Sequence, residues 1–320
     1  MDKQQKTTKK TKSNPSQNPL DQLIVEDKQL ELKLSWKKIS PVYQKVLKDL
    51  SSSLKLKGFR KGKIPLAIAE KEIGQEKIIN QVLQELIPEA YGSAIKELNH
   101  KPLTTPEFQA ISINKDNDWI IKAYFSESPE IDLKNYKKIA KEAKKVAQEE
   151  IKKSEAENKK NKTSKKSKDD SAKKIENLTD NQKKDAILQA IIAKLVEKIK
   201  PTIPRLLLKQ SAEREMDSFI KRLESLKIDL DTFLNSRQMT QEQLSSQIMI
   251  STLNQLQVEF LLKAIGEQEK LEISDQEVSS TIEATEDEKV KAQMKTDESY
   301  QSYLKQMLLK QKVLELIFDL

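Results

Sequence analysis

The sequence contains no cysteine, and His100 is the only histidine among its 320 residues. Without cysteine there are no disulfides, no thiolate nucleophile, and no cysteine-ligated zinc or iron-sulfur cluster. A single histidine leaves a Ser-His-Asp triad only formally possible and excludes a histidine-rich metal site. Most familiar enzyme chemistry is therefore excluded. We predict no catalytic residue and no metal ligand, and we expect a reducing compartment, the cytoplasm.

Glycine, aromatic residues and long apolar runs are also scarce. The chain has five glycines, 5% aromatic residues and 34% charged residues, a composition that favours a helical protein. Neither G-x-x-x-x-G-K-S/T nor G-x-G-x-x-G occurs, so we predict no nucleotide and no other cofactor. No run of about 18 apolar residues is present, and the N-terminus lacks the apolar stretch of a secretory signal. We therefore expect neither a membrane partner nor export.

The net charge of +8 is distributed unevenly along the chain. Residues 1–20 hold five lysines and one acidic residue, and we predict a disordered basic tail there. Residues 134–185 hold eighteen lysines against ten acidic residues, whereas residues 186–320 are mildly acidic. Such lysine tracts are usually solvated, and otherwise they lie against an anionic surface such as RNA.

Residues 21–133 are predicted to form an α+β domain, a small antiparallel sheet packed by helices. Alternating apolar residues from Leu30 to Trp36 predict a half-buried strand. Ser40 and Pro41 are typical of a helix start, and this helix should run to about Lys57. The remaining expected elements are a short helix to Ile73, a long helix that Pro88 kinks or splits, and two strands over 108–113 and 119–125.

Residues 134–185 read as a basic linker without a core of its own, because helical periodicity there is weak. Only Ile139, Ala143, Val146 and Ala147 suggest a marginal helix, and the sequence leaves open whether the linker is helical. Residues 186–320 are predicted to be all-helical and elongated. Capping-box patterns at Thr179, Thr240 and Ser274 mark helix starts. The remaining C-terminal elements are a helix over 206–226 and a last one over 300–318.

The stretch GFRKGKIP at residues 58–65 carries the most information about function. It places Phe59 between a glycine and three cations in a loop between two helices. An exposed aromatic ring beside cations suits a ribonucleoprotein surface, because the ring stacks or inserts while the charges neutralise phosphates. The residues alone leave open the alternative that Phe59 anchors the loop in its own core.

The same stretch resembles the ribosome-docking signature of the trigger factor family of bacterial chaperones. The order of elements in residues 21–133, and Ile203-Pro204-Arg205-Leu206-Leu207 leading into a long helix, are similar to that family as well. The resemblance implies docking at the ribosomal tunnel exit, on its protein and rRNA, through the following residues. They are Gly58, Phe59, Arg60, Lys61, Gly62, Lys63 and Pro65.

The resemblance also implies a helical chaperone domain that shields nascent or unfolded polypeptides without ATP. Flexible thioethers and aromatic rings dispersed among polar residues suit such a surface. The candidate residues are Met216, Phe219, Met249, Phe260 and Met307, and beyond these Met239, Met294 and Phe318. For any one of them, packing between helices is the simpler explanation.

One departure from the family concerns enzyme activity. Members usually carry an FKBP-like peptidyl-prolyl isomerase domain of roughly 100 residues, and only residues 134–185 stand in its place here. We therefore expect no isomerase domain. Two alternatives stay open: a chain that retains isomerase activity, and a basic RNA-binding assembly protein that does not act as a chaperone.

Overall fold

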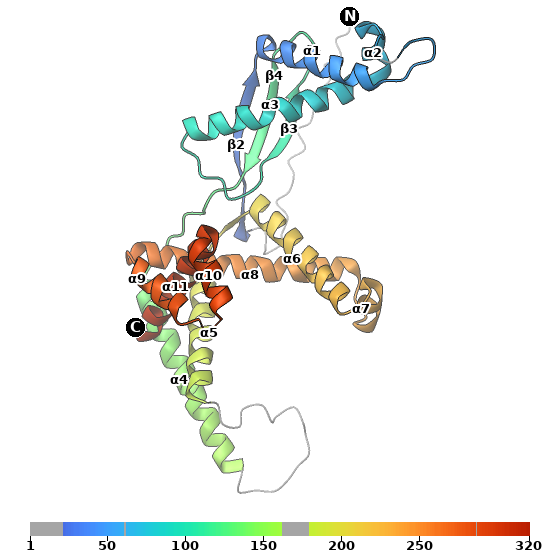
Figure 1. The fold of residues 1–320 in the computed structure, drawn as a ribbon. Helices are drawn as coiled ribbons and strands as arrows, with labels where there is room; N and C mark the ends of the chain where they lie inside the picture. The colour runs from blue at the N-terminus through green and yellow to red at the C-terminus, as the bar shows by residue number, and fades with distance from the viewer. Residues whose placement is uncertain (1–21, 61, 162–178, 286) are drawn as a thin grey trace, which may run out of the picture. The chain divides into compact units, whose positions relative to one another are not determined.

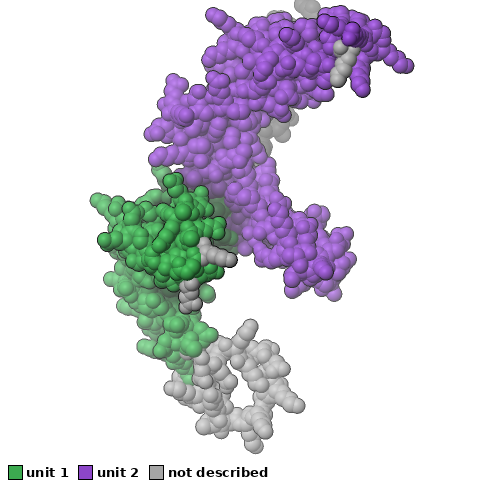
Figure 2. Space-filling view, in the orientation of Figure 1, with its two compact units in different colours: residues 1–25, 130–203, 253–320 green, residues 26–129, 204–252 purple. Residues whose placement is uncertain are grey.

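The computed structural model describes residues 22–60, 62–161, 179–285 and 287–320. These residues form two compact units, coloured separately in Figure 2. Unit 2 consists of residues 26–129 and 204–252, and unit 1 holds the rest of the described chain. The predicted N-terminal tail over 1–20 lies outside the described residues. None of the helices in the described ranges is long and apolar enough to span a membrane.

The centre of unit 2 is a three-stranded antiparallel sheet (Figure 1). Its strands are β2 (Lys28–Leu34), β3 (Glu107–Ser112) and β4 (Trp119–Phe125), in the order β2-β4-β3. Leu32 lies opposite Ile121, and both side chains are buried. Every second residue of β4 is buried, as expected for a strand with one face against a core. The strands expected from the sequence are therefore confirmed.

Helices α1 (Trp36–Ser53), α2 (Leu66–Ile73) and α3 (Gln75–Glu97) follow the sheet strand β2 in the sequence, and α1 and α3 share its core. Helix α1 starts at Trp36, earlier than the predicted start at Ser40 and Pro41, so Pro41 lies inside the helix. The earlier start is stabilised by Asp118, whose Oδ1 accepts from the Trp36 N–H at 2.7 Å. Helix α3 is not split at Pro88. A proline removes one backbone hydrogen bond, and burial of the apolar face of the helix offsets that loss.

Unit 2 also contains helices from the C-terminal half of the sequence. These are α6 (Arg205–Ser225), α7 (Leu230–Ser236) and the first part of α8 (Gln241–Gln268). The sequence predicted α6 and the start of α8 at its Thr240 capping box, but it did not predict α7. The sequence predicted one helical domain over residues 186–320. In the structure, residues 204–252 of that range belong instead to the same compact unit as residues 26–129.

Unit 1 contains the largest difference from the sequence prediction. Residues expected to form a linker instead form α4 (Tyr136–Asn161), which packs along α5 (Asp180–Ile199) (Figure 1). The buried face of α4 joins one core with α5, the second part of α8, and α11 (Glu298–Asp319). Its buried residues are Tyr136, Ala140, Ala143 and Ala147. Residues 162–178 lie outside the described chain.

The remaining elements of unit 1 are short. Strands β1 (Ile24–Val25) and β5 (Ile203–Pro204) pair, and α9 (Asp275–Glu283) and α10 (Glu288–Thr296) precede α11. The capping boxes at Thr179 and Ser274 are confirmed. Gly266 lies inside α8, where an added Cβ would approach Val313 Cγ2 to 3.3 Å. The α+β fold with a helical C-terminal region is thus confirmed.

Candidate functional site

Residues 58–60 and 62–65 lie in a loop between α1 and α2, as predicted, and all of them except Ile64 are exposed. Gly58 and Gly62 have φ values of +87° and +74°, which residues with a side chain rarely adopt. The Phe59 N–H donates to Leu56 O at 3.1 Å, and the Lys63 N–H donates to Arg60 O at 3.0 Å. The glycines therefore allow two tight turns, one on each side of Phe59 and Arg60.

The end of the loop is anchored in the protein. Ile64 is buried at 7% exposure, and Pro65 directly precedes α2, where its carbonyl accepts from Ile68 and Ala69. Pro65 has no N–H to satisfy, which suits the start of a helix.

Hydrogen bonds among three side chains hold α2 against α1: Tyr43 from α1, Glu70 from α2, and Lys115 from the turn between β3 and β4. The Tyr43 hydroxyl and Lys115 Nζ both donate to Glu70 Oε1 at 2.7 Å. These bonds, Lys115 first and then Tyr43, lower the pKa of Glu70, whereas burial and then the Glu70 bond raise the pKa of Tyr43. The loop thus connects α1 and α2, and the Tyr43–Glu70 hydrogen bond holds these two helices together.

The side chains at the loop tip face solvent. Phe59 is 39% exposed, and Arg60, Lys63 and Pro65 are exposed too. No carboxylate in the described ranges lies within ion-pair distance of Arg60 or Lys63. Lys61 lies outside the described residues. The alternative that Phe59 anchors the loop in a core does not fit this exposure, and an aromatic ring is left beside free cations.

A second feature of unit 2 is a cleft of about 270 Å³ between α6 and α8. Its apolar lining includes Ala212, Met216, Ile248 and Met249, and its polar lining includes Glu213. Two of the predicted substrate-binding residues, Met216 and Met249, are therefore brought together here. Thioether side chains adapt to varied apolar partners, so this surface can hold an unfolded segment weakly.

The other predicted substrate-binding residues lie elsewhere. Phe219 is half-buried, with its ring edge-on to Phe233 at 5.2 Å. Phe260 is only 8% exposed, which is the position of a core residue, so we remove it from the candidate surface. Met307 is 48% exposed but belongs to unit 1.

The last three candidate substrate-binding residues are at least partly buried. Met239 is half-buried in unit 2. Met294 packs against the small core of α9 and α11, and Phe318 packs against the core of α4 and α5.

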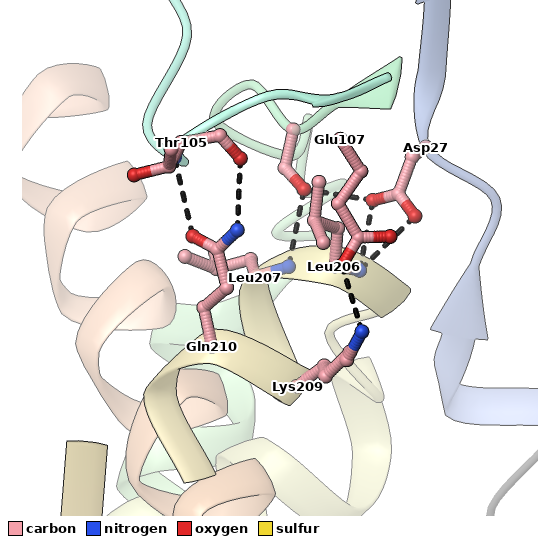
Figure 3. A network of polar contacts seen from close by, with 8 residues as sticks. Asp27, Thr105, Glu107, Leu206, Leu207, Lys209 and Gln210 are labelled. Atoms are coloured by element: carbon pink, nitrogen blue, oxygen red, sulfur yellow. Dashed lines mark hydrogen bonds and ion pairs between the residues drawn. The ribbon is translucent and has the colours of Figure 1, made fainter. Parts of the chain in front are cut away.

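Sequence reasoning missed a polar network that fixes α6 in unit 2 (Figure 3). Pro204 precedes α6 and offers no side chain to cap it, so the first N–H groups need other acceptors. Asp27 accepts from the Leu206 N–H at 2.9 and 3.0 Å, and Ser126 Oγ accepts from the Leu207 N–H at 3.1 Å. Ser126 Oγ in turn donates to Asp27 Oδ1 at 2.7 Å.

Two more contacts extend this network along α6. The Gln210 amide exchanges two hydrogen bonds with the backbone of Thr105, at 2.8 and 3.1 Å. Lys209 pairs with Glu107 at 2.7 Å. Helix α6, which forms one wall of the cleft, is thus held to the part of the unit that carries the loop. No local sequence pattern signals these contacts.

Two family models match the chain almost end to end. The model described as bacterial trigger factor protein (TF) matches residues 21–161, and the one described as its C-terminus matches residues 163–319. The chain belongs to the trigger factor family. Only residue 162 separates the two trigger factor matches.

Curated trigger factors match a shorter region. The protein from Streptococcus sanguinis (strain SK36) is 36% identical over 110 residues, and that from Streptococcus pneumoniae (strain Hungary19A-6) is 34% identical over 110 residues. Each match covers 34% of this chain and 26% of the relative, so it spans about a quarter of the curated trigger factors.

A solved trigger factor chaperone structure has the same fold. That protein is described in terms of promiscuous substrate recognition in folding and assembly activities. The match has a TM-score of 0.54 at 14% identity and covers 91% of this chain and 96% of the other. At this identity the likeness concerns the fold alone.

Proposed function

We propose that this chain is an ATP-independent chaperone that docks at the ribosomal tunnel exit and shields nascent polypeptides in the cytoplasm. The observation that carries the proposal is the loop at 58–65. Phe59 and Arg60 are exposed there on a fixed support, and no described carboxylate pairs with the arginine. A preformed loop loses little conformational freedom on binding. Membership of the trigger factor family supports the same function.

In this proposal the cleft between α6 and α8 receives the polypeptide. Met216 and Met249 contribute adaptable apolar surface, while Glu213 and Asp217 keep its rim polar. A shallow, partly polar surface binds weakly and releases its client without an energy source. Loop and cleft both belong to unit 2, so docking and shielding are functions of one compact unit.

The test is co-sedimentation with bacterial ribosomes at near-physiological salt. The triple variant Phe59→Ala, Arg60→Ala, Lys61→Ala should lose binding while its far-UV circular dichroism stays unchanged. A matched control, Ile111→Ala, Lys38→Ala, Lys48→Ala, removes one exposed apolar residue and two exposed cations from the same unit and should bind normally. Equal binding by the two variants would contradict docking through the loop.

We also propose that the chain has no prolyl isomerase activity. The described part of residues 134–185, which stand in place of an isomerase domain, consists largely of α4 and the start of α5, whose apolar side chains are buried against each other and against α8 and α11. A protease-coupled isomerisation assay on a proline tetrapeptide should therefore give the uncatalysed rate. Catalysis above that rate at micromolar protein would contradict this and favour the isomerase alternative.

The remaining alternative is an RNA-binding assembly protein without chaperone activity. The cleft favours the chaperone, because RNA recognition gives no reason for an open apolar lining of methionines. Light scattering of a refolding client protein distinguishes the two. The chaperone should suppress aggregation, and a Met216→Ser, Met249→Ser variant should suppress it less. Tight RNA binding without any suppression would favour the alternative.

A further inference from the structure

Helix α4 in unit 1 has two faces of opposite character. The face formed by Tyr136, Ala140, Ala143 and Ala147 is buried in the core of unit 1. Four exposed lysines, Lys138, Lys141, Lys145 and Lys152, are spaced by three, four and seven residues. This spacing places them on one side of an α-helix, away from the buried face. We call these four residues the lysine stripe.

Lys194 and Lys310, on other helices of unit 1, each lie within 3.2 Å of a carboxylate oxygen. The lysine stripe is set apart from other exposed lysines of the unit, such as Lys184 and Lys270, by its alignment along one side of a helix. No carboxylate among the described residues lies within 4.0 Å of a lysine in the stripe. Two lysines of α4 outside the stripe are engaged, since Lys137 pairs with Glu269 and Lys144 donates to the carbonyl of Phe318.

Two glutamates border the stripe without neutralising it by contact. Glu142 lies four residues after Lys138 and three before Lys145, and Glu149 lies four after Lys145 and three before Lys152. Both spacings bring side chains near each other on a helix, but none of these described pairs lies within 4.0 Å. Both glutamates reduce the local positive potential, but the four ammonium groups stay available for another partner.

We propose that the lysine stripe binds the phosphate backbone of RNA, as a contact independent of the proposed docking loop, residues 58–65. Lys138 and Lys152 are 14 residue steps apart, about 21 Å along the helix, and phosphates recur every few ångströms along a nucleic-acid strand. Free ammonium groups in a row neutralise such a backbone without reading its sequence. The inference goes beyond the proposed function, because it adds RNA contact by unit 1.

A phosphate backbone fits the stripe better than a membrane surface does. Helices that bind membranes insert an apolar face beneath their cations. The apolar face of α4 is already buried in the core, and the exposed Val146 points about 100° away from Lys145. The stripe therefore offers charge without an inserting surface.

The test measures binding of the full-length protein to a fluorescent RNA hairpin of about 20 base pairs by anisotropy, over a range of salt concentrations. The stripe variant changes Lys138, Lys141, Lys145 and Lys152 to Gln. The matched control changes four exposed lysines of the same unit that have carboxylate partners, so that both variants lose four charges. The control residues are Lys194, Lys198, Lys263 and Lys310.

We expect the slope of log K against log salt to fall by about 3 in the stripe variant, because each phosphate contact contributes about 0.9. Affinity at near-physiological salt should fall at least tenfold, with little change in the control. The hairpin assay contains no ribosome, so the result does not depend on docking at the tunnel exit. Equal slopes in the stripe variant and the control would overturn the proposal. So would wild-type binding to phosphatidylglycerol vesicles but not to RNA.

Discussion

At the scale of single residues, the decisive contacts in unit 2 join positions far apart in the sequence. Asp27 accepts from the N–H of Leu206, 179 residues away, and also from the hydroxyl of Ser126. A carboxylate at a helix N-terminus satisfies free N–H groups and interacts favourably with the helix dipole. The start of α6 thus depends on a side chain from the beginning of the unit.

Replacing this cap should destabilise the protein. We expect Asp27→Ala to lower the free energy of unfolding by about 1–2 kcal/mol, the range for loss of a helix N-cap. Glu26→Ala is the control, since Glu26 is exposed and adjacent. Urea denaturation followed by circular dichroism measures both. Equal midpoints for the two variants would show that Asp27 contributes nothing beyond surface charge.

The docking loop and the Asp27 network show what sequence can predict at this scale. Phe59 and its neighbouring cations were predicted because the motif is local, and Gly58 and Gly62 signal its turns directly. The sequence around Asp27 carries no such signal. Asp27 accepts from the Leu206 N–H only because the tertiary fold brings α6 next to the start of β2, and neither spacing nor composition predicts that contact.

At the scale of elements, α4 shows why a helix that packs into a core can look like a linker in the sequence. Its buried face consists largely of alanines, which bury little apolar area and give a weak periodic signal. The lysines around that face resemble the composition of a linker. What stabilises α4 is close packing against α5 and α11, and those partners lie elsewhere in the sequence.

Enlarging one of these alanines tests whether α4 belongs to a core. Ala140 is fully buried, so Ala140→Leu should force neighbouring side chains apart and cost about 1–3 kcal/mol of unfolding free energy. Glu142→Leu places the same side chain on the exposed face and should change stability by less than about 0.5 kcal/mol. Thermal denaturation compares the two. A coreless linker would tolerate both changes equally.

Two glutamates give the contacts between α9, α10 and α11 a defined pH dependence. Hydrogen bonds from Ser274 and then Lys312 lower the pKa of Glu277 to about 2, and bonds from Lys291 and then Lys295 lower the pKa of Glu283 to about 2. An unperturbed glutamate has a pKa of about 4.3. Because both folded-state values are depressed, the stabilisation is complete above about pH 4.3 and is lost as the pH falls toward 2.

We expect α9 amides to exchange faster and the free energy of unfolding to fall between about pH 4.3 and 2. A Glu277→Gln, Glu283→Gln variant should be less stable at neutral pH and should show a flatter dependence over that window. Urea denaturation at a series of pH values measures this, with amide spectra of α9 as the local readout. The same pH dependence in the variant would assign the effect to other groups.

At the scale of the whole molecule, the chain does not divide where its composition changes. Residues 204–252 join 26–129, and α8 contributes its first part to unit 2 and its second part to unit 1. The periodicity of apolar residues predicted most of the helices, but it does not predict which helices pack against one another. The important consequence for function is that the docking loop and the methionine-lined cleft belong to the same unit.

The measurement that tests this account most directly is site-specific photo-crosslinking on translating ribosomes. A photoreactive phenylalanine derivative replaces Met216 in the cleft, in wild type and in the Phe59→Ala, Arg60→Ala, Lys61→Ala background. The account predicts a crosslink from the cleft to the nascent chain, reduced at least tenfold when the loop is changed. No crosslink in either protein, or an equal crosslink in both, would contradict the claim that the loop brings the cleft to the emerging polypeptide.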